Sequence, residues 1–242
     1  MIFDSGTVSY GCRFFICDIQ QMNCIVLDTA TEWVALGVYA HGQLWQADAH
    51  IKQGHAEYTL PQLRQLLEQV NLTLAEIDLI VVGNGPGAFT GLRIGCGLAQ
   101  GLAFAHHLPL MPVSTLAAVA ASTEADYPLV AMDARMGEIY FAAYQAGAWQ
   151  QPIVSPQLTT PEHIAALPTQ AWTGCGTAWS VYTEALQQAV QDSPLTISPV
   201  SVPSSAGLLR LALSGQFSTV SAEQLSLLYL RDKVALKTHE RH

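Results

Sequence analysis

Two stretches of this sequence repeat one pattern: IVLDTATEWVALGVYAHGQLWQ at residues 25–46 and VAMDARMGEIYFAAYQAGAWQ at residues 130–150. In each, a short apolar run ends in an aspartate, Asp28 or Asp133, a polar turn follows, and a second apolar run returns. In both copies a tyrosine comes eleven positions after the aspartate and a glycine fourteen positions after it. Each copy then ends in Trp-Gln. Agreement at four landmarks indicates a duplicated β-hairpin.

The segments that follow the two hairpins also correspond in type. After the first, an apolar stripe predicts a helix over 60–70, a capping-box pattern at 73–76 opens a short helix, and the apolar run 79–82 predicts a buried strand. We then expect a long helix, capped by Thr90, to run to about His107. After the second hairpin we expect a helix that begins at Pro161, a strand over 171–173 and a helix over 178–191.

Two hairpins, each followed by alternating helices and strands, predict a duplicated two-lobed α/β fold of the actin-like, ribonuclease H-like superfamily. We expect residues 22–115 to form the first lobe and residues 116–242 the second. Residues 1–21 lack both this pattern and the features of a secretory signal. We interpret them as an extension that precedes a translation start at Met22, which an intact mass of the native protein would test.

Composition limits the function classes open to the chain. The sequence is 50% hydrophobic and 12% charged, which excludes general disorder. Its formal charge is −9 with only ten Lys and Arg, so we do not expect it to grip an RNA backbone by itself. Four of those ten lie in the last twelve residues: Arg231, Lys233, Lys237 and Arg241. No run of about 18 apolar residues could span a membrane, and five unpaired-looking cysteines fit a reducing compartment, the cytoplasm.

The first hairpin turn carries candidate phosphate-binding residues. Asp28, Thr29 and Thr31 lie in the turn that approaches the nucleotide phosphates in actin-like ATPases. The alternative is a turn aspartate that satisfies nearby backbone amides. The second turn, Asp133 to Glu138, has no Gly-Thr or Thr-Gly pair, so a second phosphate loop would be degenerate.

The segment GPGAFTGLRIG at 85–95 is the most distinctive in the chain. Gly85 and Gly87 follow a strand and precede a helix, where exposed amides can hold an anion. No Lys-Ser or Lys-Thr follows them, so the segment is not a Walker A loop. The alternative is that the glycines permit a sharp turn and close helix packing.

The helix after this segment is apolar over much of its circumference and contains small residues four apart. We expect one side to meet the chain's own sheet and the other to meet a partner helix. Together with the helix over 60–70, it forms the expected partner interface: Leu63, Leu66, Leu67, Val70, Leu92, Gly95, Leu98, Ala99 and Leu102.

No catalytic or metal-binding set stands out. His55 has Thr59 where a helical zinc pair needs a second histidine four residues on. There is no Gly-x-Ser-x-Gly elbow and no evident acid–base pair. We therefore expect no metal and no catalytic residue.

The combination of DTAT at 28–31, GPGAFTGLRIG at 85–95, DARMGEIYFA at 133–142 and YLRDKVA at 229–235 resembles the bacterial TsaB family of tRNA threonylcarbamoyladenosine biosynthesis proteins. The resemblance covers about residues 22–237. It implies an actin-like fold and a role as the non-catalytic partner of TsaD, the related subunit that performs the transfer and binds metal through an HxxxH motif.

With TsaD and the ATPase TsaE, such a protein supports the transfer of threonylcarbamoyl to the adenosine beside the tRNA anticodon. The resemblance further implies a homodimer when TsaD is absent, contact with tRNA only through the complex, no cofactor of its own, and ATP or ADP only at the complex interface. Two enzyme readings compete: a stand-alone actin-like ATPase or phosphotransferase, and a metallopeptidase-like enzyme. A further alternative is a homodimeric binding module for some other protein. Co-purification of partner proteins that do not include TsaD would favour it.

Overall fold

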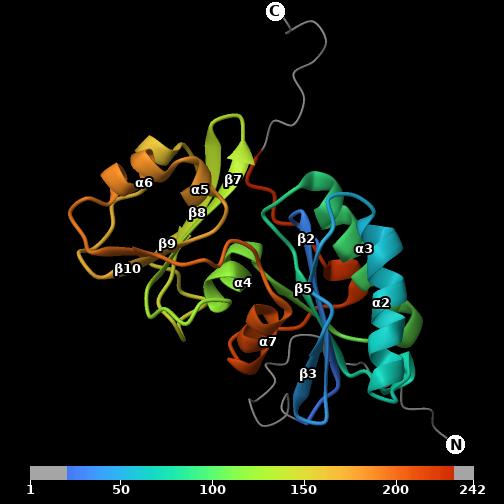
Figure 1. Cartoon of the computed structure of the whole chain (residues 1–242). Coiled ribbons are helices and arrows are strands. Elements are labelled where there is room, and N and C mark those ends of the chain that lie inside the picture. The colour runs from blue at the N-terminus through green and yellow to red at the C-terminus, as the bar shows by residue number, and fades with distance from the viewer. Residues whose placement is uncertain (1–20, 232–242) are drawn as a thin grey trace, which may run out of the picture.

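The computed structural model describes residues 21–231 of the 242-residue chain. Most of the predicted extension, residues 1–20, and the basic residues Lys233, Lys237 and Arg241 lie outside the described part. The described chain forms two lobes, each built on its own sheet (Figure 1).

The first lobe contains the following elements: β1 (Cys24–Asp28), β2 (Trp33–Ala40), β3 (Gln43–Gln46), β4 (Ala49–His50), α2 (His55–Gln69), η1 (Leu74–Glu76), β5 (Leu79–Gly83), α3 (Phe89–His106) and β6 (Leu110–Val113). The chain then continues through these elements: α4 (Thr115–Ala121), β7 (Pro128–Arg135), β8 (Glu138–Ala143), β9 (Val154–Thr159), η2 (Pro161–His163), β10 (Trp172–Cys175), α5 (Ala178–Val181), α6 (Thr183–Ala189), β11 (Leu195–Ile197), α7 (Ser205–Leu213) and η3 (Ala222–Gln224).

The two sheets have the same topology, which confirms the duplication expected from the repeat. The first has the order β3-β2-β1-β5-β6 and the second, read from its other end, β9-β8-β7-β10-β11. Strand β1 pairs antiparallel with β2 and parallel with β5, and β7 pairs in the same way with β8 and β10. Asp28 pairs with Ala35 and Asp133 with Ile139, so both aspartates lie at the turn end of their hairpins. This is the two-lobed actin-like architecture.

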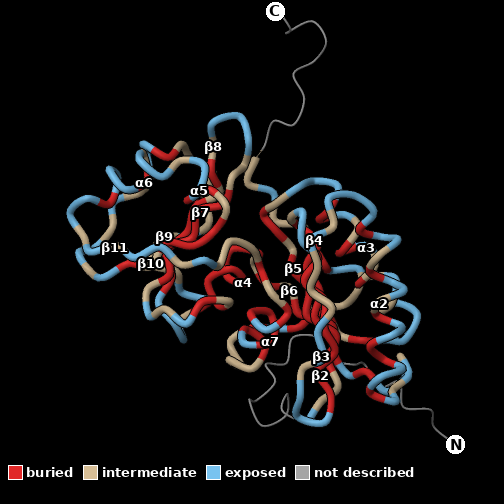
Figure 2. Tube along the Cα trace, in the orientation of Figure 1, coloured by how far each residue is buried: buried red, intermediate tan, exposed pale blue. Residues whose placement is uncertain are grey.

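The first sheet is covered on both faces. Helices α2 and α3 pack on one face, over a cluster that includes Ile25, Leu36 and Val82. Helix α7 packs on the other face, over a cluster that includes Val26, Val81 and residues of α4. Figure 2 shows buried strands between helices whose outer sides are exposed. Continuous burial of β1 and β5 explains their unbroken apolar sequences.

The extent of the second lobe differs from the expected residues 116–242. Its sheet ends at β11, and α7 then packs on β1, β2, β5 and β6 of the first lobe. Farther on, Val220 exchanges two backbone hydrogen bonds with Leu110, of 2.7 and 3.0 Å. The second face of the first sheet needs cover, and α7 from this later segment packs on it.

Local differences from the expected elements concern where helices begin, how long they are and whether they are continuous. Helix α2 begins at His55, before the apolar stripe, after Gly54 at φ 85°. The cap of α3 is Ala88, and Thr90 lies inside the first turn. The helix expected at Pro161 is one 3-10 turn, and the helix expected over 178–191 is divided into α5 and α6 at Tyr182, where φ is −121° and ψ is 36°. Within residues 21–231, no helix has both the length and the apolarity needed to cross a membrane.

Candidate functional site

The first hairpin turn holds Asp28 inside the protein. Its side chain is fully buried, with Oδ1 accepting a hydrogen bond from the Ala30 amide at 2.7 Å and Oδ2 one from Thr115 Oγ1 at 2.8 Å. Burial raises the pKa of Asp28 to about 6, and these two hydrogen bonds limit the rise. Each carboxylate oxygen therefore has a partner within the chain.

The other candidates in this turn have different surroundings. Thr29 is 1% exposed and donates from Oγ1 to the carbonyl of Gly91 at 2.8 Å. Thr31 donates to the carbonyl of Trp33 at 3.1 Å and accepts from its amide at 3.0 Å. Of the three predicted residues, only Thr31 lines the cleft between the lobes.

The glycine-rich segment packs directly on this turn. A Cβ on Gly83 would overlap the Asp28 carboxylate, and one on Gly91 would overlap the carbonyl of Thr29. A Cβ on Gly87 would lie 2.5 Å from the carbonyl oxygen of Ala30. Gly85, at φ 114°, lies against the carbonyl of Leu228. Close packing thus accounts for these glycines, and anion binding at Gly85 and Gly87 stays a prediction.

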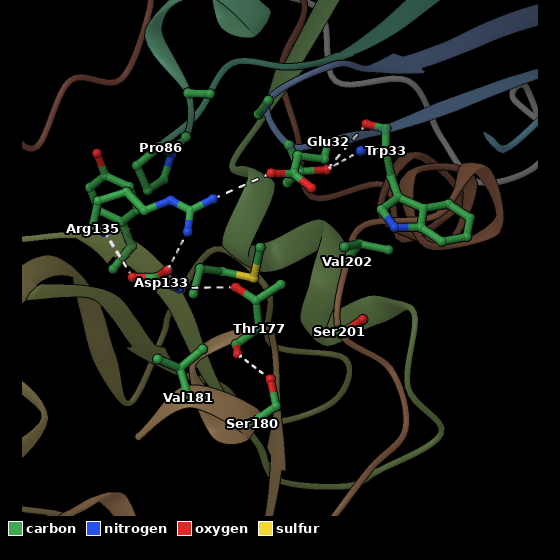
Figure 3. Close-up of a pocket in the computed structure, with 17 residues that line it drawn as sticks. Glu32, Trp33, Pro86, Asp133, Arg135, Thr177, Ser180, Val181, Ser201 and Val202 are labelled. Carbon is green, nitrogen blue, oxygen red and sulfur yellow. Dashed lines mark hydrogen bonds and ion pairs between the residues drawn. The ribbon is translucent and has the colours of Figure 1, made fainter. Parts of the chain in front are cut away.

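A cleft of about 370 Å³ lies between the lobes, where the two hairpin turns face each other (Figure 3). The first lobe contributes the turn around Thr31 and the loop at Pro86, and the second contributes the β7–β8 hairpin and α5 with its N-cap Thr177. Its wall combines apolar side chains with hydroxyl groups: Trp33, Met132, Val181, Val202, Thr31, Thr177, Ser180 and Ser201. This volume falls in the range of small-molecule sites.

The second hairpin turn forms an ion pair across this cleft. Arg135 lies 3.3 Å from Glu32 of the first lobe and 3.2 Å from Asp133 of its own turn. Thr177 Oγ1 accepts a hydrogen bond from the Asp133 amide at 3.0 Å. The turn carries left-handed backbone at Arg135 and Met136, with φ of 65° and 59°. Its side chains therefore contact protein at the place where an actin-like ATPase would use a second phosphate loop.

The expected partner interface needs correction, because most of its members belong to the chain's own core. Seven are buried beneath α2 and α3: Leu63, Leu66, Leu67, Val70, Leu92, Gly95 and Ala99. A Cβ on Gly95 would overlap Thr29 Oγ1, so this glycine faces inward. Only Leu98 and Leu102 are partly exposed.

Other residues form the outer surface of these two helices. Phe104 is 70% exposed and Leu60 49% exposed. Added Cβ atoms on Gly97 and Gly101 would meet open space. We call the surface that carries Leu60, Gly97, Gly101 and Phe104 the α2–α3 face. The alternation along α3, with Gly95 inside and Gly97 outside, could have been found by placing its residues on a helical wheel.

Thr59 lies where a helical zinc pair would need a second histidine, and it makes a structural contact there. Thr59 is fully buried and donates from Oγ1 to the carbonyl of His55 at 2.6 Å, while His55 Nε2 lies 2.8 Å from the carbonyl oxygen of Thr31. Within the described residues, no group of three or more His, Cys, Asp or Glu could hold a metal ion. The three cysteines Cys24, Cys96 and Cys175 are buried, and burial raises the pKa of each thiol.

Shared strand order in two lobes, with a hairpin turn from each lobe at the cleft, defines an actin-like protein. A model of the family described as TsaD, tRNA N6-adenosine threonylcarbamoyltransferase, matches residues 49–231.

The tRNA threonylcarbamoyladenosine biosynthesis protein TsaB of Haemophilus influenzae is 31% identical over 90% of this chain and 98% of its own. The TsaB protein of Escherichia coli K12 is 32% identical over 89% and 97%. The solved structure of YeaZ from Pseudomonas aeruginosa superposes with a TM-score of 0.78 at 34% identity, over 87% of this chain and all of that one. The chain belongs to the TsaB family.

Proposed function

We propose that this protein is the accessory partner of TsaD in the transfer of threonylcarbamoyl to the tRNA adenosine beside the anticodon, and that it supplies no catalytic group. The carrying observation is its match to proteins named TsaB along nearly the whole of both chains. The buried Asp28, with both oxygens bonded inside the chain, supports a structural role for the turn that would otherwise contact phosphate. TsaE is the further expected partner, with ATP or ADP at the complex interface.

The α2–α3 face is the docking surface we propose for TsaD, and for a second copy of this chain when TsaD is absent. Its glycines have open space above them, so the backbone of a partner helix can approach closely. Phe104 and Leu60 offer exposed apolar side chains that would be buried on association. The same surface would then be shared between homodimer and heterocomplex.

The test is reconstitution of tRNA modification from purified TsaD, TsaE, this protein and threonylcarbamoyl-adenylate, each also omitted in turn. Product should require this protein together with TsaD and should never form from this protein alone. Equal modification in its absence would overturn the proposal. ATP hydrolysis by this protein alone would instead favour the stand-alone ATPase reading.

Substitution of Gly101 by arginine should block docking without harming the fold. The new side chain projects into open space, and loss of a helix glycine favours the helix by about 0.5–1 kcal/mol. We expect an unchanged or higher Tm together with at least a tenfold weaker affinity for TsaD, measured by calorimetry, as a clash at a packed interface of about 1.4 kcal/mol or more implies.

The matched control is Gln187→Arg, which adds the same charge to an exposed helix position of the second lobe. It should bind TsaD as the parent protein does. Equal affinity of Gly101→Arg and the parent would exclude the α2–α3 face as the docking surface while leaving the reconstitution result intact.

A further inference from the structure

The last described residues run from the first lobe to the second. Asn84, at the end of β5, donates from Nδ2 to the carbonyl of Ser226 at 3.1 Å, and its own carbonyl accepts from the Leu228 amide at 2.8 Å. These two bonds attach the segment to the first lobe. Figure 1 shows this segment, in red, leading toward the β7–β8 hairpin. We call residues 226–231 the C-terminal strap.

At the end of the strap, Arg231 contacts the second lobe at the β7–β8 turn. Its Nη2 forms an ion pair of 2.6 Å with Glu138 and donates to the carbonyl of Ala134 at 3.0 Å. Nη2 also lies 3.4 Å from the carbonyl oxygen of Arg135, and Nη1 lies 3.3 Å from the sulfur of Met136. One guanidinium thus contacts four residues of the hairpin turn, which a planar fork of donors is suited to do.

Burial makes this contact stronger than the other ion pair between the lobes. The side chain of Arg231 is 20% exposed and that of Glu138 is 34% exposed. Arg135 and Glu32, which also join the lobes, are 75% and 57% exposed. Exposed pairs are screened by water and contribute little, whereas a charge-assisted bond shielded from solvent contributes more. Arg231 is therefore the main polar connection between the strap and the second lobe.

The strap also contacts the first turn of α3. The ring of Tyr229 lies 5.7 Å from that of Phe89, and Arg93 Nε donates to the Tyr229 hydroxyl at 3.3 Å. The guanidinium of Arg93 in turn lies 3.7 Å from the centre of the Phe89 ring. Any displacement of the strap must therefore disturb Phe89 and Arg93 at the start of α3.

We propose that the C-terminal strap fixes the position of the β7–β8 turn against the first lobe, with Arg231 as the positioning residue that joins this turn to the first lobe and to the start of α3. Release of Arg231 frees the β7–β8 turn to move at the cleft, while the hydrophobic cluster shared by the two sheets keeps the lobes together. The strap thereby couples the geometry of the inter-lobe cleft to α3, one of the two helices that form the α2–α3 face.

Hydrogen exchange of the full-length protein, followed by mass spectrometry, tests this coupling. In Arg231→Ala, amides of residues 134–140 and 84–93 should exchange about tenfold faster, as loss of charge-assisted hydrogen bonds implies. Strands β1 and β5 and residues 128–133 of β7 should be unchanged. Glu138→Gln should produce a smaller change in the same two segments, and should add nothing to Arg231→Ala.

Two further variants distinguish the contact of the strap with the β7–β8 turn from its contact with α3. Tyr229→Ala should accelerate exchange in residues 84–93 and leave residues 134–140 protected, because Arg231 still holds the turn. Arg64→Ala, which removes the exposed Arg64–Glu68 pair on α2, should change neither segment. Uniformly faster exchange throughout the chain in Arg231→Ala, or unchanged protection at residues 134–140, would overturn the proposal. Every reading is made on the isolated protein, so the outcome does not depend on TsaD.

Discussion

Substitution of Gly91 by alanine should lower the free energy of unfolding by about 3 kcal/mol, the upper end of the cost of overpacking. The added Cβ would overlap the carbonyl of Thr29, and backbone on both sides leaves no flexible group to move aside. The loss should also separate α3 from the first hairpin turn, because Thr29 Oγ1 donates to the Gly91 carbonyl. Urea denaturation followed by circular dichroism measures the change.

The matched substitution is Gly97→Ala, six residues farther along the same helix. There a Cβ meets open space, so we expect stabilisation of about 0.5–1 kcal/mol from the better helix propensity of alanine. Opposite signs at two glycines of one helix would confirm the assignment of its inner and outer sides. Equal effects at Gly91 and Gly97 would contradict it.

The second large effect concerns Asp28 and pH. Folding raises the pKa of this carboxyl from 3.8 to about 6, so between these values the folded state binds more protons than the unfolded state. The free energy of unfolding therefore falls as pH rises from about 4 to about 6, by about 3 kcal/mol for a shift of about two units. Above that range the cost of the buried charge is present in full.

Asp28→Asn should remove this pH dependence. The amide oxygen can accept from the Ala30 amide, and its NH₂ can donate to Thr115 Oγ1, so both contacts keep a partner. We expect the variant to be more stable than the parent at pH 8, by up to about 3 kcal/mol, and to lose this advantage near pH 4. Urea titrations of both proteins at several pH values give the difference, in which the contributions of other carboxyls cancel.

The activity of the same variant distinguishes a structural role of Asp28 from a functional need for its charge. A structural aspartate predicts that Asp28→Asn supports TsaD as well as the parent does in the reconstituted reaction. Loss of that support in a folded, stable variant would show that the charge itself is needed. A stability difference that stays constant from pH 4 to pH 8 would instead contradict the raised pKa.

The fold could be predicted because the hairpins repeat visibly. Strand pairing within a hairpin is local, and the landmarks after Asp28 and Asp133 define the same two strands in both halves. Buried parallel strands such as β5 carry unbroken apolar runs that periodicity detects. The destination of α7 could not be predicted, since an amphipathic helix does not indicate which of two sheets it will cover.

Most residues predicted for the partner interface are buried in the chain's own core, and the α2–α3 face proposed in their place uses other residues of the same helices. An apolar stripe such as Leu63, Leu66 and Leu67 looks the same whether it meets the chain's own sheet or a partner. Gly95 and Gly97 face opposite ways around α3, which a helical wheel of the whole helix distinguishes although the residues next to each glycine do not. The contacts of Arg231 could not be predicted from the sequence, because its partners lie more than 90 positions away from it.

The return of α7 to the first sheet also has a consequence for how the chain folds during synthesis. A nascent chain that ends at β11 contains every strand of both sheets, yet Val26 and Val81 still lack the helix that covers them. Domains made on the ribosome generally fold from the N-terminus as units, but this first lobe is completed only when residues 205–213 have emerged. Until then an apolar face of the first sheet stays accessible to chaperones. We therefore expect the two lobes to complete folding together at the end of translation.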